Sequence, residues 1–374
     1  MKVTIERATL LKALAHVQSV VERRNTIPIL SNVLIEAKDS RLALSATDMD
    51  LAIREEVAAE VAAPASTTAA AHTLYDIVRK LPEGSQVALE LATGGGQLTL
   101  RAGRARFSLS CLPVDEFPVM SAGDLPHEFA LDAGALRDLI DHTRFAISTE
   151  ETRYYLNGIH LHATKVGRAE LLRAVATDGH RLARFQMPLP EGGAGMPAVI
   201  VPRKAIAEVR KLVEDSAESV RVALSETRIR FTFDSVVLTS KLIDGTFPDY
   251  ERVIPADNDK IMQVNNKIFA EAVDRVSTIS KDQSRAVKLV LSRGSLMLSA
   301  SGQDTGSATE EIEVDYAGDG IEIGFNARYL LDIASQIRGE HAKFVMSDAA
   351  SPTIVRDGSD DGDGSLYVLM PMRV

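Results

Sequence analysis

The residues most suggestive of chemistry lie in the stretch VATDGHRLA, which begins at Val175 and ends at Ala183. An acid, Asp178, and a base, His180, stand two positions apart with Gly179 between them. A carboxylate beside an imidazole could carry out general acid–base catalysis. The same residues could instead form a turn, because an Asp side chain accepts hydrogen bonds from the main chain two residues on and glycine adopts a positive φ.

Other candidates for catalysis or metal binding are weak. The chain has no G-x-S-x-G elbow, H-E-x-x-H pair, phosphate-binding P-loop or G-x-G-x-x-G fingerprint. Its one cysteine, Cys111, excludes a disulfide within the chain and a cysteine-based metal site. The acidic run DGSDDGDG, from Asp357 to Gly364, lacks the spacing and the closing glutamate of an EF-hand. We therefore expect neither a metal nor a cofactor.

The composition is typical of a globular protein. The chain has 374 residues, of which 45% are hydrophobic and 25% charged, and a net charge of −10. No apolar run approaches the roughly 18 to 20 residues that a membrane helix needs. Glu6 and Lys12 interrupt the N-terminal segment, which is therefore unlike a signal peptide. We expect a soluble cytoplasmic protein with no membrane partner.

Three segments of roughly 125 residues repeat one order of elements, which is far longer than a solenoid period. Each segment predicts a strand, a helix, alternating strands, a second helix and a closing pair of strands. The second helices, for example, are expected in HTLYDIVRKLP, RKAIAEVRKLVE and ARYLLDIASQIRG. Strands that bury one face need helices to cover that face.

The predicted fold class is therefore α+β, with three repeated domains that each pack two helices on antiparallel sheet. We expect these domains at residues 1–120, 127–251 and 259–374. Polar, proline-containing stretches at 119–126 and 251–260 are suitable linkers.

The repeat bears on the opening stretch. Thr177-Asp178 occupies the position of Thr47-Asp48 in the first repeat and of Gln303-Asp304 in the third. No histidine follows in the other two copies, so the repeat favours a turn over a catalytic pair.

Basic residues concentrate in the predicted helices, whereas acids concentrate in strands, loops and linkers. The helical stretches carry Lys12, Arg23, Arg24, Arg79, Lys80, Arg137, Arg144, Arg203, Lys204, Arg210, Lys211, Lys267, Arg275, Lys281, Arg328 and Arg338. Such a face would attract a phosphate backbone although the whole chain is acidic. No aromatic ladder or recognition-helix pattern indicates that bases are read.

Four motifs carry a resemblance to a known family. They are RYYLNG from Arg153, ATDGHRLA from Ala176, SKLIDG from Ser240 followed by FPDY, and the terminal MPMR from Met370. In this order and spacing, over essentially the full length, the chain resembles the bacterial DNA sliding clamp, the beta subunit of the replicative DNA polymerase.

The resemblance implies a head-to-tail homodimer that closes into a ring around duplex DNA, with sheets outside and twelve helices inside. Helices about 10 Å apart would enclose a hole of about 28 Å, which is wider than a B-form duplex. The ring would slide on DNA without reading its sequence. It would tether the clamp loader, the polymerase catalytic subunit and other proteins with a clamp-binding motif, and would have no catalysis of its own.

The resemblance also implies site residues. The DNA contacts are Arg24, Tyr154 and Tyr155, with His72 and Glu150 as weaker candidates. The walls of an apolar partner-peptide pocket are Leu156, Thr177, Gly179, His180, Arg181, Leu182, Pro248, Arg252, Val253, Val368, Leu369, Met370, Pro371, Met372 and Arg373. His180 and Arg181 are expected at its rim.

The chain departs from the family pattern at four positions. Glu150 stands where glutamine is usual, Ser284 where an aromatic is usual, Pro352 where serine is usual, and Val374 where leucine is usual. The first puts a direct phosphate contact in doubt, and the others imply a different peptide preference at the same site.

The ring is expected to close by pairing strand edges, with Phe107, Leu109 and Ile279 at the interface. We also expect Pro371 to end the last strand and to leave the tail free to line the pocket. Two other functions remain open. A hydrolase using Asp178 and His180 predicts substrate turnover, and a protein-binding scaffold predicts no retention on circular DNA.

Overall fold

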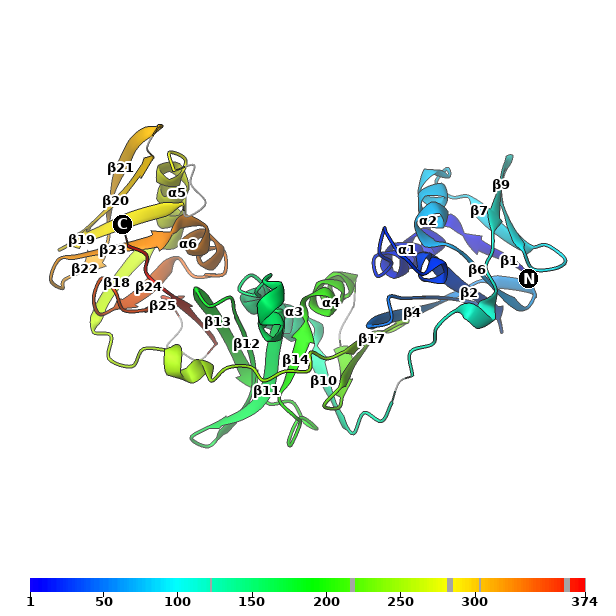
Figure 1. Cartoon of the computed structure of the whole chain (residues 1–374), viewed down its shortest axis with the longest axis horizontal. Coiled ribbons are helices and arrows are strands. Elements are labelled where there is room, and N and C mark those ends of the chain that lie inside the picture. The colour runs from blue at the N-terminus through cyan, green and yellow to red at the C-terminus, as the bar shows by residue number, and fades with distance from the viewer. Residues whose placement is uncertain (122, 216–218, 281–284, 303, 360–363, 374) are drawn as a thin grey trace. The chain divides into compact units, whose positions relative to one another are not determined.

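The computed structural model describes residues 1–374 apart from 122, 216–218, 281–284, 303, 360–363 and 374. Figure 1 shows the helices α1 (Arg7–Gln18), α2 (Ala71–Lys80), α3 (Ala133–Arg144), α4 (Arg203–Asp215), α5 (Asn266–Ser277) and α6 (Ala327–Ala334). Short 3-10 turns are η1 (Pro28–Ser31), η2 (Val114–Glu116), η3 (Glu151–Leu156) and η4 (Tyr250–Val253). Each repeat thus has the two predicted helices.

Within the described ranges, the strands form four antiparallel sheets. Sheet A has the order β5 (Glu60–Ala63), β1 (Lys2–Glu6), β7 (Gln86–Leu91), β8 (Gln97–Ala102), β9 (Ala105–Ser110). Sheet B has the order β10 (His127–Asp132), β15 (Ser219–Leu224), β16 (Arg228–Thr232), β17 (Val236–Lys241), β4 (Leu51–Ala58), β3 (Arg41–Thr47), β2 (Asn32–Lys38), β6 (Ala65–Ala70).

Sheet C has the order β14 (Val199–Pro202), β11 (Gly158–Val166), β12 (Ala169–Thr177), β13 (Arg181–Pro188), β26 (Ser365–Leu369), β25 (Thr353–Asp357), β24 (His341–Met346), β18 (Lys260–Asn265), β22 (Asp315–Tyr316). Sheet D has the order β21 (Gly306–Glu313), β20 (Ser295–Gly302), β19 (Ala286–Ser292), β23 (Ile321–Asn326).

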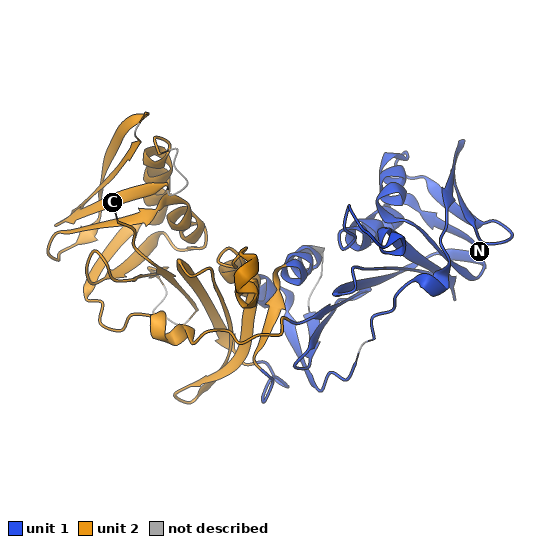
Figure 2. Cartoon of the chain, viewed as in Figure 1, with its two compact units in different colours: residues 1–137, 190–197, 204–242 blue, residues 138–189, 198–203, 243–374 orange. Residues whose placement is uncertain are grey.

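The chain divides into two compact units, which Figure 2 colours separately. Unit 1 contains Met1–Arg137, Pro190–Pro197 and Lys204–Leu242, and unit 2 contains Asp138–Leu189, Ala198–Arg203 and Ile243–Val374. Sheets A and B belong to unit 1, and sheets C and D to unit 2. The central repeat is therefore shared between the units, because its strands extend the sheets of both neighbouring repeats.

Local sequence explains the helices. In α2, Ala71, Leu74 and Val78 are buried at intervals of three and four residues, which is the period of a helix with one covered face. Asparagines cap α5 and α6, where Asn265 and Asn326 each accept a main-chain hydrogen bond from the first turn. In unit 1, α1 packs on α2 and on β3 and β4, and in unit 2, α5 packs on α6 and on β20 and β21.

Two strand pairings join successive repeats. β4 of the first repeat pairs with β17 of the second, and we call this the first junction. β13 of the second repeat pairs with β26 of the third, and we call this the second junction. The two pairings have the same register. Ala52 lies opposite Thr239 at the first junction, and the corresponding residues at the second junction, Leu182 and Val368, also lie opposite each other.

The basic helix face differs in part from the prediction. Arg23, Arg24 and Arg338 lie outside the helices, and Lys281 lies outside the described residues. Several cations on helices are paired with acids, as Arg210 is with Glu214. Within the described part of the chain, no helix is long and apolar enough to span a membrane.

Candidate functional site

The stretch from Thr177 to Arg181 is a tight turn between β12 and β13. The Thr177 hydroxyl donates to the Arg181 carbonyl at 2.7 Å, and Asp178 Oδ1 accepts the main-chain N–H of His180 at 2.9 Å and that of Arg181 at 3.0 Å. Gly179 has φ +88°. A side chain there would also meet Arg153, whose Nη1 lies 2.6 Å from an ideal Cβ position. The prediction of a turn is confirmed.

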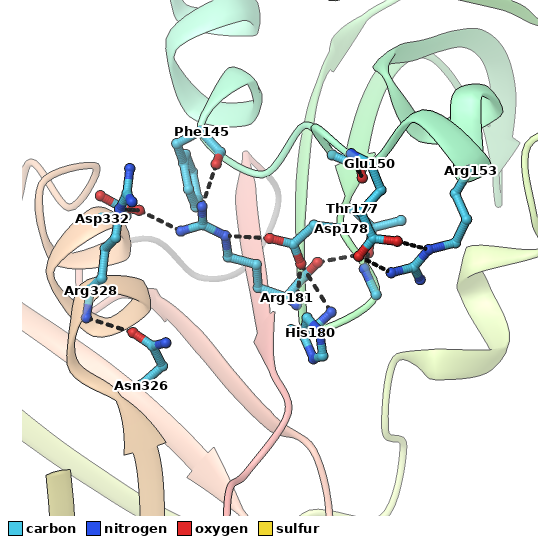
Figure 3. A network of polar contacts seen from close by, with 12 residues as sticks. Phe145, Glu150, Arg153, Thr177, Asp178, His180, Arg181, Asn326, Arg328 and Asp332 are labelled. Atoms are coloured by element: carbon cyan, nitrogen blue, oxygen red, sulfur yellow. Dashed lines mark hydrogen bonds and ion pairs between the residues drawn. The ribbon is translucent and has the colours of Figure 1, made fainter. Parts of the chain in front are cut away.

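The side chains of Asp178 and His180 do not form an acid–base pair in this turn. His180 meets Asp178 through its main-chain N–H, while its ring stacks on Tyr329 of α6 with centroids 6.4 Å apart. The second oxygen of Asp178 binds Arg181 Nε at 3.1 Å instead (Figure 3). The residues therefore position one another structurally, and the geometry does not favour the hydrolase.

Arg181 is buried, so the expectation that it lies at the rim is wrong. Its side chain is 7% exposed and binds Asp178, Asp332 of α6 at 2.5 Å, and the Phe145 carbonyl at 2.6 Å (Figure 3). Its guanidinium also lies 4.3 Å from the centre of the Tyr329 ring. Arg181 thus ties the second repeat to the third inside unit 2.

Leu182 and Val368 lie in an apolar cluster at the second junction. Leu156, Leu182 and Val368 are 3%, 2% and 2% exposed and belong to one buried cluster. The other buried members are Val175, Ile200, Phe247, Tyr250, Ile354 and Leu366, with Tyr155, Ile243, Ile254 and Val345 packed against them. The sequence prediction named three of the nine buried members and missed Phe247 and Ile354 in particular.

Strand alternation separates the predicted wall residues into two groups. Side chains at successive positions of a strand point to opposite faces. Leu182 and Val368 face the cluster, whereas Arg181 and Leu369, which oppose each other in the ladder, face the helices. Leu369 thus points away from the cluster, into the core on the helix side, which corrects its assignment to the pocket wall.

Exposed apolar side chains adjoin this cluster in the chain. Val253 is 48% exposed and precedes Ile254, which packs against the cluster, and Met370 is 41% exposed and lies two residues after Val368. Pro248 and Arg252 are exposed, and Arg252 pairs with Asp249 at 2.7 Å. Surface apolar groups over a packed floor are suited to a docked peptide.

The C-terminal tail is anchored, not free. Pro371 is expected to end the last strand, and β26 ends one residue earlier than that, at Leu369. The Met370 N–H then donates to the His180 carbonyl at 2.9 Å. Beyond Pro371, Met372 N–H donates to the Gly324 carbonyl of β23 at 2.8 Å. Met372 is partly exposed and Arg373 is exposed, whereas Ser284 and Val374 lie outside the described residues. The tail therefore connects sheet C to sheet D.

A polar group borders the cluster on β11 and β12. The His160 ring stacks on Phe247 with centroids 4.6 Å apart and an angle of 4°. Burial, reinforced by the charge of neighbouring His162, lowers the pKa of His160 to about 4. Arg173 binds Glu251 at 2.6 Å and the Tyr250 hydroxyl at 3.2 Å, which fixes the linker over the sheet.

The predicted DNA contacts differ in solvent exposure and in whether their polar atoms are already bonded to the protein. Arg24 and Tyr154 are exposed, while Tyr155 packs against the cluster. Both ring nitrogens of His72 lie within hydrogen-bonding distance of protein atoms, Gln18 Oε1 at 2.7 Å and the Val21 carbonyl at 3.0 Å. His72 therefore has no ring nitrogen left for a phosphate.

Glu150 is bound to Arg153, a residue that the sequence prediction did not assign to any site. The two side chains form hydrogen bonds of 2.8 and 2.6 Å (Figure 3). This bond to Arg153 holds the pKa of Glu150 below its usual value. A carboxylate that stays ionised repels phosphate, so Glu150 is unsuited to a direct DNA contact.

The predicted interface residues lie near strand edges. β9, which carries Phe107 and Leu109, is an outer strand of sheet A, and β21 is an outer strand of sheet D. Ile279 follows α5, and its carbonyl accepts the Thr305 hydroxyl just before β21. Among the described residues, no group of three or more His, Cys, Asp or Glu is placed to hold a metal.

Comparison with known proteins gives consistent matches over the whole length. Models of the N-terminal, central and C-terminal domains of the DNA polymerase III beta subunit match residues 1–121, 130–249 and 251–373. The beta sliding clamp of Caulobacter vibrioides (strain NA1000 / CB15N) is 57% identical over 374 residues, with both chains fully covered. That of Escherichia coli (strain K12) is 37% identical over 377 residues, again with full coverage of both.

Solved structures agree with these relatives. The beta sliding clamp of Caulobacter crescentus with bound PEG has a TM-score of 0.98 and 57% identity, and the match covers 100% of this chain and 99% of that one. A clamp from Bartonella birtlesii bound to griselimycin has a TM-score of 0.97 and 49% identity, with both chains fully covered.

Proposed function

This chain belongs to the family of DNA polymerase III beta subunits, the beta sliding clamps, and we propose that it encircles duplex DNA as a head-to-tail homodimer. As a ring it would hold the clamp loader, the replicative polymerase and other clamp-binding proteins on DNA. It would do so in the cytoplasm, without a cofactor and without catalysis of its own. We also propose residues 1–120, 127–251 and 259–374 as its three domains.

The proposal of a ring rests on two outer strands, β9 and β21, which in the described part of the chain lack the pairing that their counterparts in the other repeats make. β9 corresponds by its hairpin register to β17 and β26, and β21 corresponds to β4 and β13. Both junctions pair a strand of the first kind with one of the second kind. Among the described strands, β9 and β21 are the members without such a partner. A contact of this kind used twice closes a dimer.

Charge supports the same pairing. Arg104 and Arg106 lie in or beside β9, whereas β21 carries Glu311 and Glu313, together with Glu310, which Arg275 already binds at 2.6 Å. Opposite charges on the two edges favour the head-to-tail partner, and like charges disfavour pairing of β9 or β21 with itself.

The junctions also predict a register for this interface. Ala52 lies opposite Thr239 at the first junction, and the corresponding residues of the free edges are Ser307 and Ser108. Both serines are exposed, so paired cysteines there should cross-link with little disturbance. In a Cys111→Ser background, Ser108→Cys with Ser307→Cys should give a covalent dimer on oxidation.

A matched pair tests the register. Ser108→Cys with Thr309→Cys shifts one cysteine by two residues on the same face and should cross-link poorly. Equal cross-linking of both pairs, or of neither, would contradict the proposed edge pairing.

We propose that the exposed side chains Arg24 and Tyr154 contact the DNA, and that Tyr155, Glu150 and His72 contribute little direct binding. Weak phosphate contacts suffice for a ring, because topology retains it. The partner-peptide site that we propose comprises Leu156, Leu182 and Val368 as floor, with Val253 and Met370 exposed beside it. Thr177, Gly179, His180, Pro248, Arg252, Pro371, Met372 and Arg373 would surround it.

Topological retention is the decisive test. After a clamp loader and ATP have loaded the protein on nicked circular duplex, it should elute with the circle and be lost when the circle is cut. Equal retention on linear and circular duplex would indicate ordinary phosphate binding. No retention on either, with intact peptide binding, would favour a scaffold.

A further inference from the structure

A groove at the first junction is not used by the proposed function. It has a volume of about 390 Å³ and lies between the outer face of sheet B and the linker segment 117–120. The linker residues Phe117, Pro118, Val119 and Met120 form one wall. Val119 is 84% exposed, which makes it the most exposed large apolar side chain among the described residues.

This groove is the counterpart of the peptide site at the second junction. Phe117-Pro118 matches Phe247-Pro248 in the repeat, and each phenylalanine is buried in an apolar cluster beside its own junction. Leu30 corresponds to Leu156 through the strand registers, and both belong to those clusters. The same construction therefore recurs, with a linker crossing a sheet that two repeats share.

The floors of the two sites differ in chemistry. Ala52 and Thr239 replace Leu182 and Val368. The floor at the first junction therefore has less apolar surface and carries a hydroxyl. Smaller side chains leave more room in the groove. Its size falls in the range of roughly 300 to 1,000 Å³ that is typical of ligand sites.

The groove is lined by two arginines, which differ in whether their side chains are paired within the described part of the chain. Arg54 is neutralised by Glu36 and by Glu56, the latter at 3.1 Å. Arg230 lies in the same ladder and also lines the groove, and no hydrogen bond or ion pair joins its side chain to a described residue. A partly buried guanidinium beside apolar walls is suited to a carboxylate on the same ligand as an apolar side chain.

We infer that the first-junction groove is a second peptide site, which takes an extended acidic segment with one aliphatic anchor. The anchor lies between the linker wall and Ala52, and a neighbouring carboxylate of the segment binds Arg230. This inference rests on the proposed function for its partner, a protein already held at the second junction.

Methionines at both sites allow each to be observed separately. Met120 lines the groove, whereas Met370 and Met372 lie at the second junction. The full-length protein is labelled with ¹³C at methionine methyls, and the three signals are assigned by Met→Leu variants. The probes are acetyl-Glu-Leu-Val-Asp-amide, its basic counterpart acetyl-Lys-Leu-Val-Lys-amide, and acetyl-Gln-Leu-Val-Leu-Phe-amide for the second junction.

The acidic probe should shift the Met120 signal to saturation and leave Met370 unmoved, and the basic probe should shift neither. Arg230→Gln should weaken the acidic probe by roughly tenfold, the usual size of a lost charge-assisted hydrogen bond. Arg221→Gln, an exposed arginine outside the groove, should not weaken it.

An unmoved Met120 signal, or equal shifts with both charged probes, would overturn the inference. The outcome is separable from the proposed function, because the third probe reports on Met370 and Met372. If it shifts those signals while Met120 stays silent, the second-junction site stands and the second peptide site is wrong.

Discussion

The first and second junctions contain the same turn, but its aspartate binds a different cation at each. Thr47-Asp48 and Thr177-Asp178 form the same hydrogen-bonded turn. Asp48 Oδ1 accepts the main-chain N–H groups of Asp50 and Leu51. Asp178 Oδ1 accepts those of His180 and Arg181 in the same way. In both turns the other carboxylate oxygen binds a cation. At the first junction this is Lys204 of α4, and at the second it is Arg181 of the turn itself.

The surroundings of these cations set the difference. Lys204 is 34% exposed and also binds Glu22 and the Val20 carbonyl. Arg181 is 7% exposed, with two carboxylates, a carbonyl and two aromatic rings around it. The same turn thus supports a partly solvated ion pair at the first junction and a buried one at the second. Corresponding positions in the repeats therefore share a backbone conformation, but their ion pairs need not contribute equally to stability.

The largest effect is expected from removing the buried cation. Arg181→Ala leaves Asp178 and Asp332 without their partner and should lower the free energy of unfolding by about 3–5 kcal/mol. Lys204→Ala should cost about 1 kcal/mol, because that pair is partly solvated. Urea denaturation followed by circular dichroism measures both. Equal losses would mean that burial does not distinguish the junctions.

Acid should destabilise the second junction selectively. The pKa of His160 is about 4 in the folded protein, against 6.5 for a free histidine, so the unfolded chain binds the proton more readily. The free energy of unfolding should therefore fall as the pH drops from 6.5 towards 4, by about 2 kcal/mol at pH 5.

The control for this acid effect copies the first junction. His160 corresponds to Leu34 there, so His160→Leu should remove most of the loss between pH 6.5 and 5. An unchanged pH dependence in this variant would assign the effect to other groups, such as buried His142, whose pKa burial also lowers.

Exchanging the floor residues should move peptide affinity. Leu182→Ala gives the second junction the side chain of Ala52 and should weaken acetyl-Gln-Leu-Val-Leu-Phe-amide about tenfold, as expected for an apolar contact truncated in a packed site. Ala52→Leu should leave that affinity unchanged. Calorimetric titration of both variants tests the site, and it would be misplaced if Leu182→Ala bound normally.

The smallest expected effect concerns the turn itself. Met49 has φ 78° where Gly179 has φ 88°, and side chains rarely adopt this conformation. Met49→Gly should be nearly neutral or stabilise the protein by about 0.5 kcal/mol, because relief of strain is offset by unfolded-chain entropy. Gly179→Ala should destabilise it, because a residue with a side chain is strained at φ 88°. Thermal melting compares the two, and a destabilised Met49→Gly variant would contradict this account.

Local patterns predicted the repeat, its helices and the turn, because each depends on residues close in sequence. The side to which a wall residue points was harder to predict. Arg181 and Leu182 are neighbours in the chain, but only Leu182 faces the cluster. Alternation along β13 carries that information once the strand is known.

Other features depended on distant parts of the chain. The anchoring of Met372 needs Gly324 of another sheet, and nothing in MPMR indicates it. Phe247 belongs to the FPDY motif, yet its burial depends on His160 and on the strands that pack against it. The groove at the first junction could have been found by matching Phe117-Pro118 to Phe247-Pro248.

Sheets shared between repeats also constrain how the chain is made. β4 ends at Ala58 and its partner β17 begins at Val236, while β13 ends at Pro188 and its partner β26 begins at Ser365. During synthesis each waiting strand therefore exposes an open edge for some 180 residues, about 10 to 35 s at usual ribosome speeds. Unpaired edges template aggregation. We therefore expect translational pauses after β4 or β13, which lengthen the exposure of these edges, to lower the yield of soluble protein.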